Sequence, residues 1–366
     1  MSHSPDCPGR ADYTVGWICA LRVEYTAAQV FLDVKYPKPD SAGNSPGDDN
    51  HYTHGSVAGH NVVIAVLPGG DYGTASAANV ATNLSRSYPN VRIGLMVGIG
   101  GGAPTSDRDI RLGDIVVSEP GNARSGVLQY DFGKLVQGGD YQYTKVLNKP
   151  PVVLRTALTG LKSRYEINGH SLEQAVEDIL SKNRRLRKTY GRPSSDILLK
   201  SHVLHSGSCQ EADCSREEEN LVERDMRDEE DSILVHYGLV ATGNSVMQDA
   251  TLRDEFARRE RVLCFEMEAG GLMDTLPCLV IRGICDYSDS HKNKQWQGYA
   301  AMVAAAFAKD ILGEVEPSAV QSEWQLSETL KTSKISVSYI SVVCTKICIT
   351  QLPIRPSKPV SKLPLT

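Results

Sequence analysis

Short apolar runs alternate with amphipathic helical patterns from Tyr13 to about Leu312, and this alternation limits the fold more than any other feature. Apolar runs of about four to eight residues indicate buried strands, and longer patterns with a 3.6-residue period indicate helices. Strands that alternate with helices are typical of α/β proteins. We therefore expect one long α/β domain, a three-layer sandwich in which helices flank a central mixed β-sheet.

The pattern also predicts the individual elements. The expected strands are residues 13–21, 52–56, 61–67, 93–97, 115–118, 233–242, 262–265 and 278–285. The expected helices are residues 23–32, 73–87, 246–258, a short segment from Met267, and about 295–312. Strands 52–56 and 61–67 should form a hairpin that turns at Gly59.

Two regions depart from the alternation. Residues 143–231 are predicted to be an insertion with helices at 153–163 and 171–190, of which the second opens with Ser171 and Gln174 in capping-box spacing. Its acidic segment 211–231 and its basic run 184–188 are expected to be solvated. Residues 314–366 are rich in Ser, Thr, Lys and Pro, so we expect a disordered or non-core tail after a catalytic domain at 12–313.

Composition excludes several classes of partner. The 366 residues carry 39 Lys and Arg against 44 Asp and Glu, so a net charge of −5 predicts neither nucleic-acid nor membrane binding. Residues 1–12 lack the basic and apolar regions of a signal peptide, which favours a cytoplasmic protein. Nine cysteines without a framework spacing are expected to be reduced thiols.

The glycine cluster Gly98-Ile99-Gly100-Gly101-Gly102-Ala103 follows a predicted strand and fits the dinucleotide-binding pattern. Such a loop must open a helix whose N-terminus faces the pyrophosphate. Here a polar segment and then another strand follow, so no nucleotide cofactor is expected. Glycines at the end of a strand still allow a small ligand to approach the backbone closely.

Acidic residues lie near the ends of several predicted strands. Glu266 and Glu268 follow strand 262–265, Asp286 follows strand 278–285, and Glu24 follows the first strand. Each could cap a helix or turn, bind ligand hydroxyls, or transfer protons. Because parallel strands end at one edge of a sheet, these acids and the glycine cluster should converge there.

Metal and nucleophile sites are less well supported. His202, His205, Cys209 and Cys214 could be arranged as zinc ligands, but the Cys spacing is loose and a loop is the favoured interpretation. No metal is therefore predicted. Cys285 is expected to be a core thiol, and the sequence contains no Gly-x-Ser-x-Gly motif.

Six segments in order resemble the purine/uridine phosphorylase superfamily, and most of all its nucleosidase branch. That branch includes methylthioadenosine/S-adenosylhomocysteine nucleosidases and the related domains of fungal NLR-type proteins. The segments are residues 18–24, 97–102, 112–118, 241–247, 265–269 and 282–286. The resemblance implies a nucleoside phosphorylase/hydrolase-like fold and a homo-oligomeric purine nucleosidase of purine salvage that uses no cofactor.

The resemblance also assigns roles to residues. Asp286 would protonate the purine at N7, and Glu24 would position the attacking water. Glu268 would bind the ribose hydroxyls above Met267. The other residues expected to bind substrate are Glu266, Val246 and Met247, of which Val246 and Met247 would flank the base. Asn244 stands in place of an acid usual in methylthioadenosine nucleosidases, and Gly98, Ile99, Gly100 and Gly101 would line the ribose side.

Two reactions and one non-catalytic role fit this set of residues. Hydrolysis needs an acid for the leaving base, a stabilised cationic sugar and a held water. Phosphorolysis needs arginines to bind a phosphate dianion, and Arg22 and Arg92 are the only candidates near the expected site in the sequence. Glu24 would also repel phosphate. Hydrolysis is therefore favoured over phosphorolysis and over a non-catalytic nucleoside-sensing module, which the intact set of acids argues against.

Overall fold

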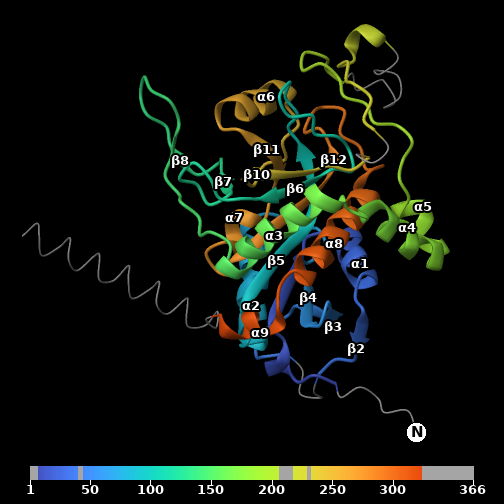
Figure 1. Cartoon of the computed structure of the whole chain (residues 1–366). Helices are drawn as coiled ribbons and strands as arrows, with labels where there is room; N and C mark the ends of the chain where they lie inside the picture. Colours follow the sequence, from blue (N-terminus) through green and yellow to red (C-terminus); the bar gives the residue numbers. More distant parts are fainter. Residues whose placement is uncertain (1–6, 40–43, 206–216, 229–231, 324–366) are drawn as a thin grey trace, which may run out of the picture. The chain divides into compact units, whose positions relative to one another are not determined.

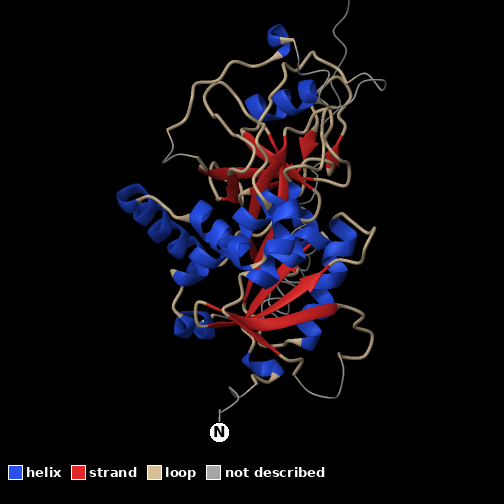
Figure 2. Ribbon diagram, turned by 90° about the vertical axis from the view of Figure 1, so that its right-hand side faces the viewer, coloured by secondary structure: helices blue, strands red, loops and turns tan. Residues whose placement is uncertain are grey.

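The computed structural model describes residues 7–39, 44–205, 217–228 and 232–323, which form a mixed sheet between two layers of helices (Figure 1, Figure 2). The strands of the main sheet are β1 (Val15–Cys19), β2 (Val34–Tyr36), β3 (His51–Val57), β4 (His60–Val66), β5 (Ile93–Gly102), β6 (Ile115–Ser118), β7 (Val127–Gln129), β10 (Val235–Thr242), β11 (Val262–Glu266) and β12 (Cys278–Asp286). Strands β8 (Gly133–Lys134) and β9 (Gln142–Tyr143) form a separate hairpin.

The helices divide between the two faces of this sheet. They are α1 (Arg22–Val30), α2 (Thr74–Ser87), α3 (Val152–Asn168), α4 (Leu172–Lys182), α5 (Arg184–Tyr190), α6 (Ala250–Arg259), α7 (Ala269–Leu272), α8 (Gln297–Gly313) and α9 (Pro317–Ser322), with single 3-10 turns at Arg10–Asp12 and Glu218–Asn220. The predicted helices and strands are thus present, although several bounds differ and two helices, α4 and α5, stand where one was expected.

Alternating side chains of the central strands build the two cores. In β1, Trp17 packs into the apolar cluster of α1 and α8, whereas Ile18 packs into the cluster of α2. Successive side chains of a strand point to opposite faces, so one buried strand supplies both layers. The three-layer α/β sandwich expected from the sequence is confirmed.

Strand polarity brings functional segments to one edge. The order is β11-β10-β6-β12-β5-β1-β4-β3-β2, and β12, β5, β1 and β4 run parallel. The sheet is mixed because β12 pairs antiparallel with β6 and β5 pairs antiparallel with β11. The carboxyl ends of β1, β5 and β12 therefore lie side by side.

The glycine cluster belongs to β5 and does not follow it. The strand continues to Gly102 because Gly98 pairs with Arg282 and Gly101 pairs with Asp286 of β12. No helix begins at these glycines, so the loop-to-helix geometry of a dinucleotide site is not formed there.

The predicted insertion contributes to the core. Leu154 of α3 and Val176 of α4 pack in the same apolar cluster as α8. The single helix expected at 171–190 is wrong: it breaks at Asn183, whose side chain donates to the carbonyl of Ile179. Ser171 occupies the N-cap of α4, but its side chain makes no capping hydrogen bond.

Other expectations need smaller changes. The hairpin of β3 and β4 turns at Ala58 and Gly59, which have φ values of 49° and 83°. In the segment expected to be solvated, Arg227 is instead paired with the buried Asp114 at 2.7 Å, while the basic run at 184–188 is largely exposed as expected. The cysteines of the described ranges are free thiols.

The expected tail starts inside the core. Val315 and Val320 are buried, and His60 Nε2 lies 2.8 Å from the carbonyl oxygen of Val315. Residues 324–366 lie outside the described residues, as do Cys209 and Cys214. Among the helices that the structure describes, none is long and apolar enough to cross a membrane.

Candidate active site

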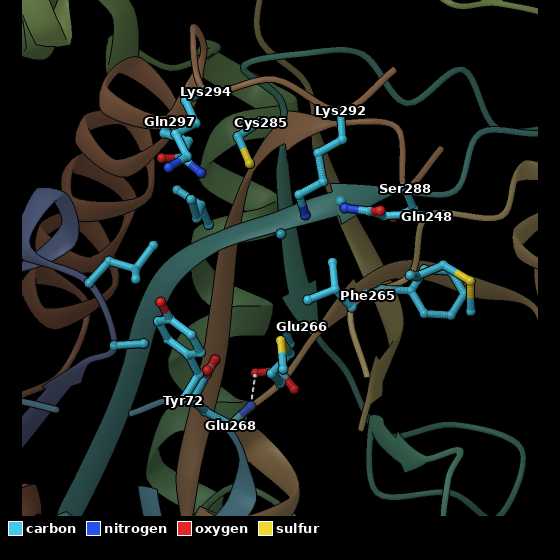
Figure 3. Close-up of a pocket in the computed structure, with 18 of the residues that line it drawn as sticks. Tyr72, Gln248, Phe265, Glu266, Glu268, Cys285, Ser288, Lys292, Lys294 and Gln297 are labelled. Atoms are coloured by element: carbon cyan, nitrogen blue, oxygen red, sulfur yellow. Dashed lines mark hydrogen bonds between the residues drawn. The ribbon is translucent and has the colours of Figure 1, made fainter. Parts of the chain in front are cut away.

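A cavity of about 380 Å³ opens where β1, β5, β11 and β12 end (Figure 3). Its walls come from six separate segments of the chain, which the fold brings together. Nine of the residues expected from the sequence line it: Glu24, Ile99, Gly100, Gly101, Val246, Met247, Glu266, Met267 and Glu268.

Glu24 joins the first helix to the glycine strand. Its Oε2 accepts hydrogen bonds from the backbone amides of Ala20 at 2.7 Å and Leu21 at 2.8 Å, and so caps α1. Its Oε1 accepts from the amide of Ile99 at 2.8 Å. Burial raises the pKa of Glu24, although the nearby Arg282 guanidinium and these amides oppose the rise. The capping role and a cavity-lining position are therefore combined in one side chain.

Arg282 lies beneath the cavity and was not among the residues expected from the sequence. It is fully buried in β12, it is ion-paired with Glu266, and its Nη2 is 3.6 Å from Glu268 Oε2. The carboxylates of Glu24, Glu266 and Glu268 raise its pKa against the effect of burial. Three buried carboxylates thus surround one guanidinium. The signal in the sequence is a lone arginine inside the apolar run 278–285.

Glu266 and Glu268 have different roles in the fold. Glu266 accepts from the backbone amides of Glu268 at 3.1 Å and Ala269 at 3.1 Å, so Glu266 caps α7. Glu268 makes no capping hydrogen bond and faces the cavity. Burial raises the pKa of Glu268 to about 7, in opposition to Arg282.

Asp286 is fixed by its neighbours at the other end of the cavity. Its Oδ1 accepts from the amide of Ser288 at 2.9 Å, which is the turn role that the sequence left open. Its Oδ2 lies 3.0 Å from Lys292 Nζ and 3.2 Å from the thiol of Cys285. Asp286 is almost fully buried, and Lys292, Cys285 and Ser288 line the cavity in its place.

The glycines of β5 leave the space that these groups occupy. A Cβ on Gly98 would overlap Glu24 and lie 2.5 Å from Arg282 Nη1. A Cβ on Gly101 would overlap Ser288 and lie 2.6 Å from Asp286 Oδ1. The glycines therefore allow side chains to approach the strand, in addition to any role toward a ligand.

Two of the expected residues do not line the cavity. Asn244 does not line the cavity: its Oδ1 accepts from the amide of Thr74 at 3.1 Å, and its Nδ2 donates to Asp131 at 3.0 Å. Gly98 is not a cavity wall either, because Glu24 covers it. Sequence reasoning also missed Tyr72 and Lys294, both of which line the cavity and have no motif around them.

No metal centre is formed by the residues that the structure describes, since they contain no group of three or more His, Cys, Asp or Glu side chains with suitable spacing. His202 and His205 are described, but their expected partners Cys209 and Cys214 are not.

Comparison with known proteins gives a family match over most of the chain. The sequence profile described as "Phosphorylase superfamily" matches residues 14–313. A nucleotide-binding leucine-rich repeat (NLR)-like protein of Hyaloscypha variabilis is 43% identical over 311 residues, which are 85% of this chain and 30% of that protein. The chain thus spans less than a third of this relative. The ATP nucleosidase Cap17 of Escherichia coli is 33% identical over 86 residues, 22% of this chain and 17% of that protein.

Solved structures share the fold at low identity. Futalosine hydrolase of Helicobacter pylori has a TM-score of 0.52 at 14% identity, with 83% of this chain and 99% of that chain covered. The 5′-methylthioadenosine/S-adenosylhomocysteine nucleosidase of Neisseria meningitidis, in complex with methylthio-immucillin-A, has a TM-score of 0.53 at 14% identity, with 82% and 99% covered. These likenesses concern the arrangement of strands and helices.

Proposed function

Because the chain belongs to the phosphorylase superfamily, we propose that its cavity hydrolyses the N-glycosidic bond of purine ribonucleosides such as adenosine, inosine and guanosine to free base and ribose. One observation carries the proposal: Glu24, Glu266 and Glu268 surround the single guanidinium of Arg282 beside the cavity. The excess negative charge stabilises the electron-poor sugar that forms as the bond breaks.

The cavity residues take separate parts of this reaction. Glu24, fixed by three backbone amides, positions the attacking water and accepts its proton. Glu268 accepts hydrogen bonds from the ribose hydroxyls. The Asp286 end of the cavity serves the leaving base. Apolar contact with sugar and base comes from Met267, Val246 and Met247, while Ile99, Gly100 and Gly101 form the wall on the ribose side.

The same charges favour water over phosphate as the nucleophile. A phosphate nucleophile needs unbalanced cations beside the sugar, but Arg282 is paired with Glu266 and Glu268, and Lys292 is paired with Asp286. The other lysine of the lining, Lys294, is exposed. Neither Arg22 nor Arg92 lines the cavity. Arg92 precedes β5 at its amino end and donates to Asn90, so it lies at the opposite edge of the sheet.

The test is product analysis in phosphate-free buffer. Purified protein is incubated with adenosine, inosine, guanosine and methylthioadenosine, and products are separated by chromatography. We expect free base and ribose. Turnover that requires added phosphate and yields ribose 1-phosphate would establish phosphorolysis, and unchanged nucleoside would contradict hydrolysis of these substrates.

A purine nucleotide is the second candidate substrate, and one observation favours it. Lys294 lines the cavity and is exposed, so its ammonium is available to a phosphate chain that leaves the cavity. The partial match to an ATP nucleosidase points the same way. If ATP is the substrate, Lys294→Gln should lower kcat/KM for ATP about tenfold and leave adenosine unaffected.

The expected homo-oligomer, cytoplasmic location and place in purine salvage stay predictions. Size-exclusion chromatography with light scattering measures the oligomeric state directly. A mass of one chain would contradict the expected assembly.

A further inference from the structure

The loop after β12 places a cation between Asp286 and the cavity. Lys292 Nζ lies 3.0 Å from Asp286 Oδ2, and Lys292 lines the cavity whereas Asp286 does not. In Figure 3 the Lys292 side chain points inward from one edge of the cavity, with Glu266 and Glu268 at the other end. A base bound at this end would meet the ammonium group first.

We propose that Lys292 is the residue that donates the proton to the departing base, and that Asp286 is a positioning residue that acts through it. This inference rests on the proposed hydrolysis and names its acid. It differs from the role that the family resemblance implies for Asp286.

The surroundings of Asp286 support the assignment. Its Oδ1 is occupied by the amide of Ser288, and its Oδ2 faces both Lys292 and the thiol of Cys285. Gly101 of β5 lies next to Asp286 Oδ1, since a Cβ on Gly101 would be 2.6 Å from this oxygen. The carboxylate is therefore held in one orientation, which is the arrangement of a group that orients a neighbour.

The charges at this end of the cavity favour the protonated form of Lys292. Asp286 and, more weakly, Cys285 and Asp289 raise the pKa of Lys292 against the effect of its burial. Lys292 therefore carries its proton at neutral pH. Lys292 lies 3.0 Å from Asp286 and lines the cavity, so of these two groups it is the ammonium that a bound base contacts.

The step balances without a further reactant. As the C1′–N9 bond breaks, its electron pair moves onto the purine, and N7 takes a proton from the Lys292 ammonium. Water attacks C1′ and gives a proton to Glu24. Proton exchange with solvent returns Lys292 to the ammonium and Glu24 to the carboxylate, so the sum is nucleoside plus water to base plus ribose.

The decisive experiment compares two leaving groups. Lys292→Met, Lys292→Arg and wild type are assayed on inosine and on 4-nitrophenyl β-D-ribofuranoside, whose phenolate leaves without protonation. We expect Lys292→Met to lower kcat on inosine about 10²-fold or more and to change the nitrophenyl substrate less than about threefold. Lys292→Arg should remain as slow on inosine as Lys292→Met, because a guanidinium does not release its proton.

Each other outcome overturns the inference. Equal losses on both substrates would show a structural role, which thermal melting of Lys292→Met checks separately. Rescue by Lys292→Arg would show a binding cation, and unchanged turnover of Lys292→Met would show no role. Lys188→Met, an exposed lysine of α5, controls for the loss of one positive charge. Failure of the wild type on all nucleosides would instead contradict the proposed function.

Discussion

Gly98 and Glu24 approach so closely that the glycine has no room for a side chain beside the carboxylate. The β5 backbone can therefore lie close to both Glu24 and Arg282, which occupy the side-chain position of Gly98, while the amide of Ile99 donates to Glu24. Strand β5, the cap of α1 and the buried charges of Glu24 and Arg282 therefore meet at Gly98.

Replacement of this glycine should disrupt the charge network. In Gly98→Ala the new methyl would overlap Glu24 and crowd Arg282, so Glu24 must move from its three amide partners. We expect kcat to fall about tenfold or more and the free energy of unfolding to fall by about 1–3 kcal/mol, the usual cost of overpacking. Turnover and urea unfolding measure the two effects. Gly121→Ala is the control, because nothing lies within 4 Å of its new Cβ; equal behaviour of both variants would contradict the prediction.

Loss of Arg282 should destabilise the protein in a pH-dependent way. In Arg282→Met, Glu24, Glu266 and Glu268 keep their burial and lose their cation. Removal of one partner of a buried ion pair costs about 3–5 kcal/mol. Unpaired carboxylates have raised pKa values in the folded state, so the loss is fully present above those values and shrinks as pH falls and the carboxylates bind protons.

Urea unfolding at pH 8 and pH 5 tests this sign. Arg282→Lys should lie between wild type and Arg282→Met, since it keeps a charge without the planar donor geometry. A destabilisation by Arg282→Met that is the same at both pH values would mean that packing, and not charge, dominates.

Ionisation of Glu268 should govern substrate binding near neutral pH. The pKa of Glu268 is raised to about 7, mainly by burial, so its ionised fraction increases roughly tenfold between pH 6 and pH 8. The ionised group is the better acceptor for ribose hydroxyls. We expect kcat/KM to rise over this interval in the wild type and to lose this rise in Glu268→Gln. Glu166→Gln, on the exposed side of α3, should keep the wild-type profile.

Asp286→Asn should lower kcat about 10²-fold or more while the protein stays folded. The amide oxygen can still accept from Ser288, so the turn is kept, whereas the charge that holds Lys292 is lost. Steady-state kinetics with a melting curve measure both. Near wild-type turnover would return Asp286 to a turn role and move the positioning role to Asp289, which is also buried and whose pKa burial raises.

The parts of the fold that are set by local patterns could be predicted from the sequence. The β3–β4 hairpin and strand β6 were expected close to their observed bounds. Helix α6 was expected from Val246 but begins at Ala250, because the Asp249 side chain accepts from the amides of Thr251 and Leu252. Residues 245–248 are therefore left outside the helix to line the cavity.

The parts of the site that depend on distant contacts could not be predicted in this way. Pairing of Gly98 with Arg282 in adjacent strands places the arginine under the acids, and no local pattern around Arg282 reports that register. Asn244 was carried over from a motif, yet contacts with Thr74 and Asp131 from other segments decide its orientation.

The anchoring of the last described helix has a practical meaning for fragment design. The family match ends at residue 313, but Val315 and Val320 fill the core and His60 reaches the carbonyl of Val315. A recombinant fragment cut at the family boundary would therefore lose an anchor of β4 and expose apolar surface to self-association. A fragment that extends through Ser322 keeps Val315, Val320 and the contact of His60. The folded domain is therefore longer than the segment that the family profile matches.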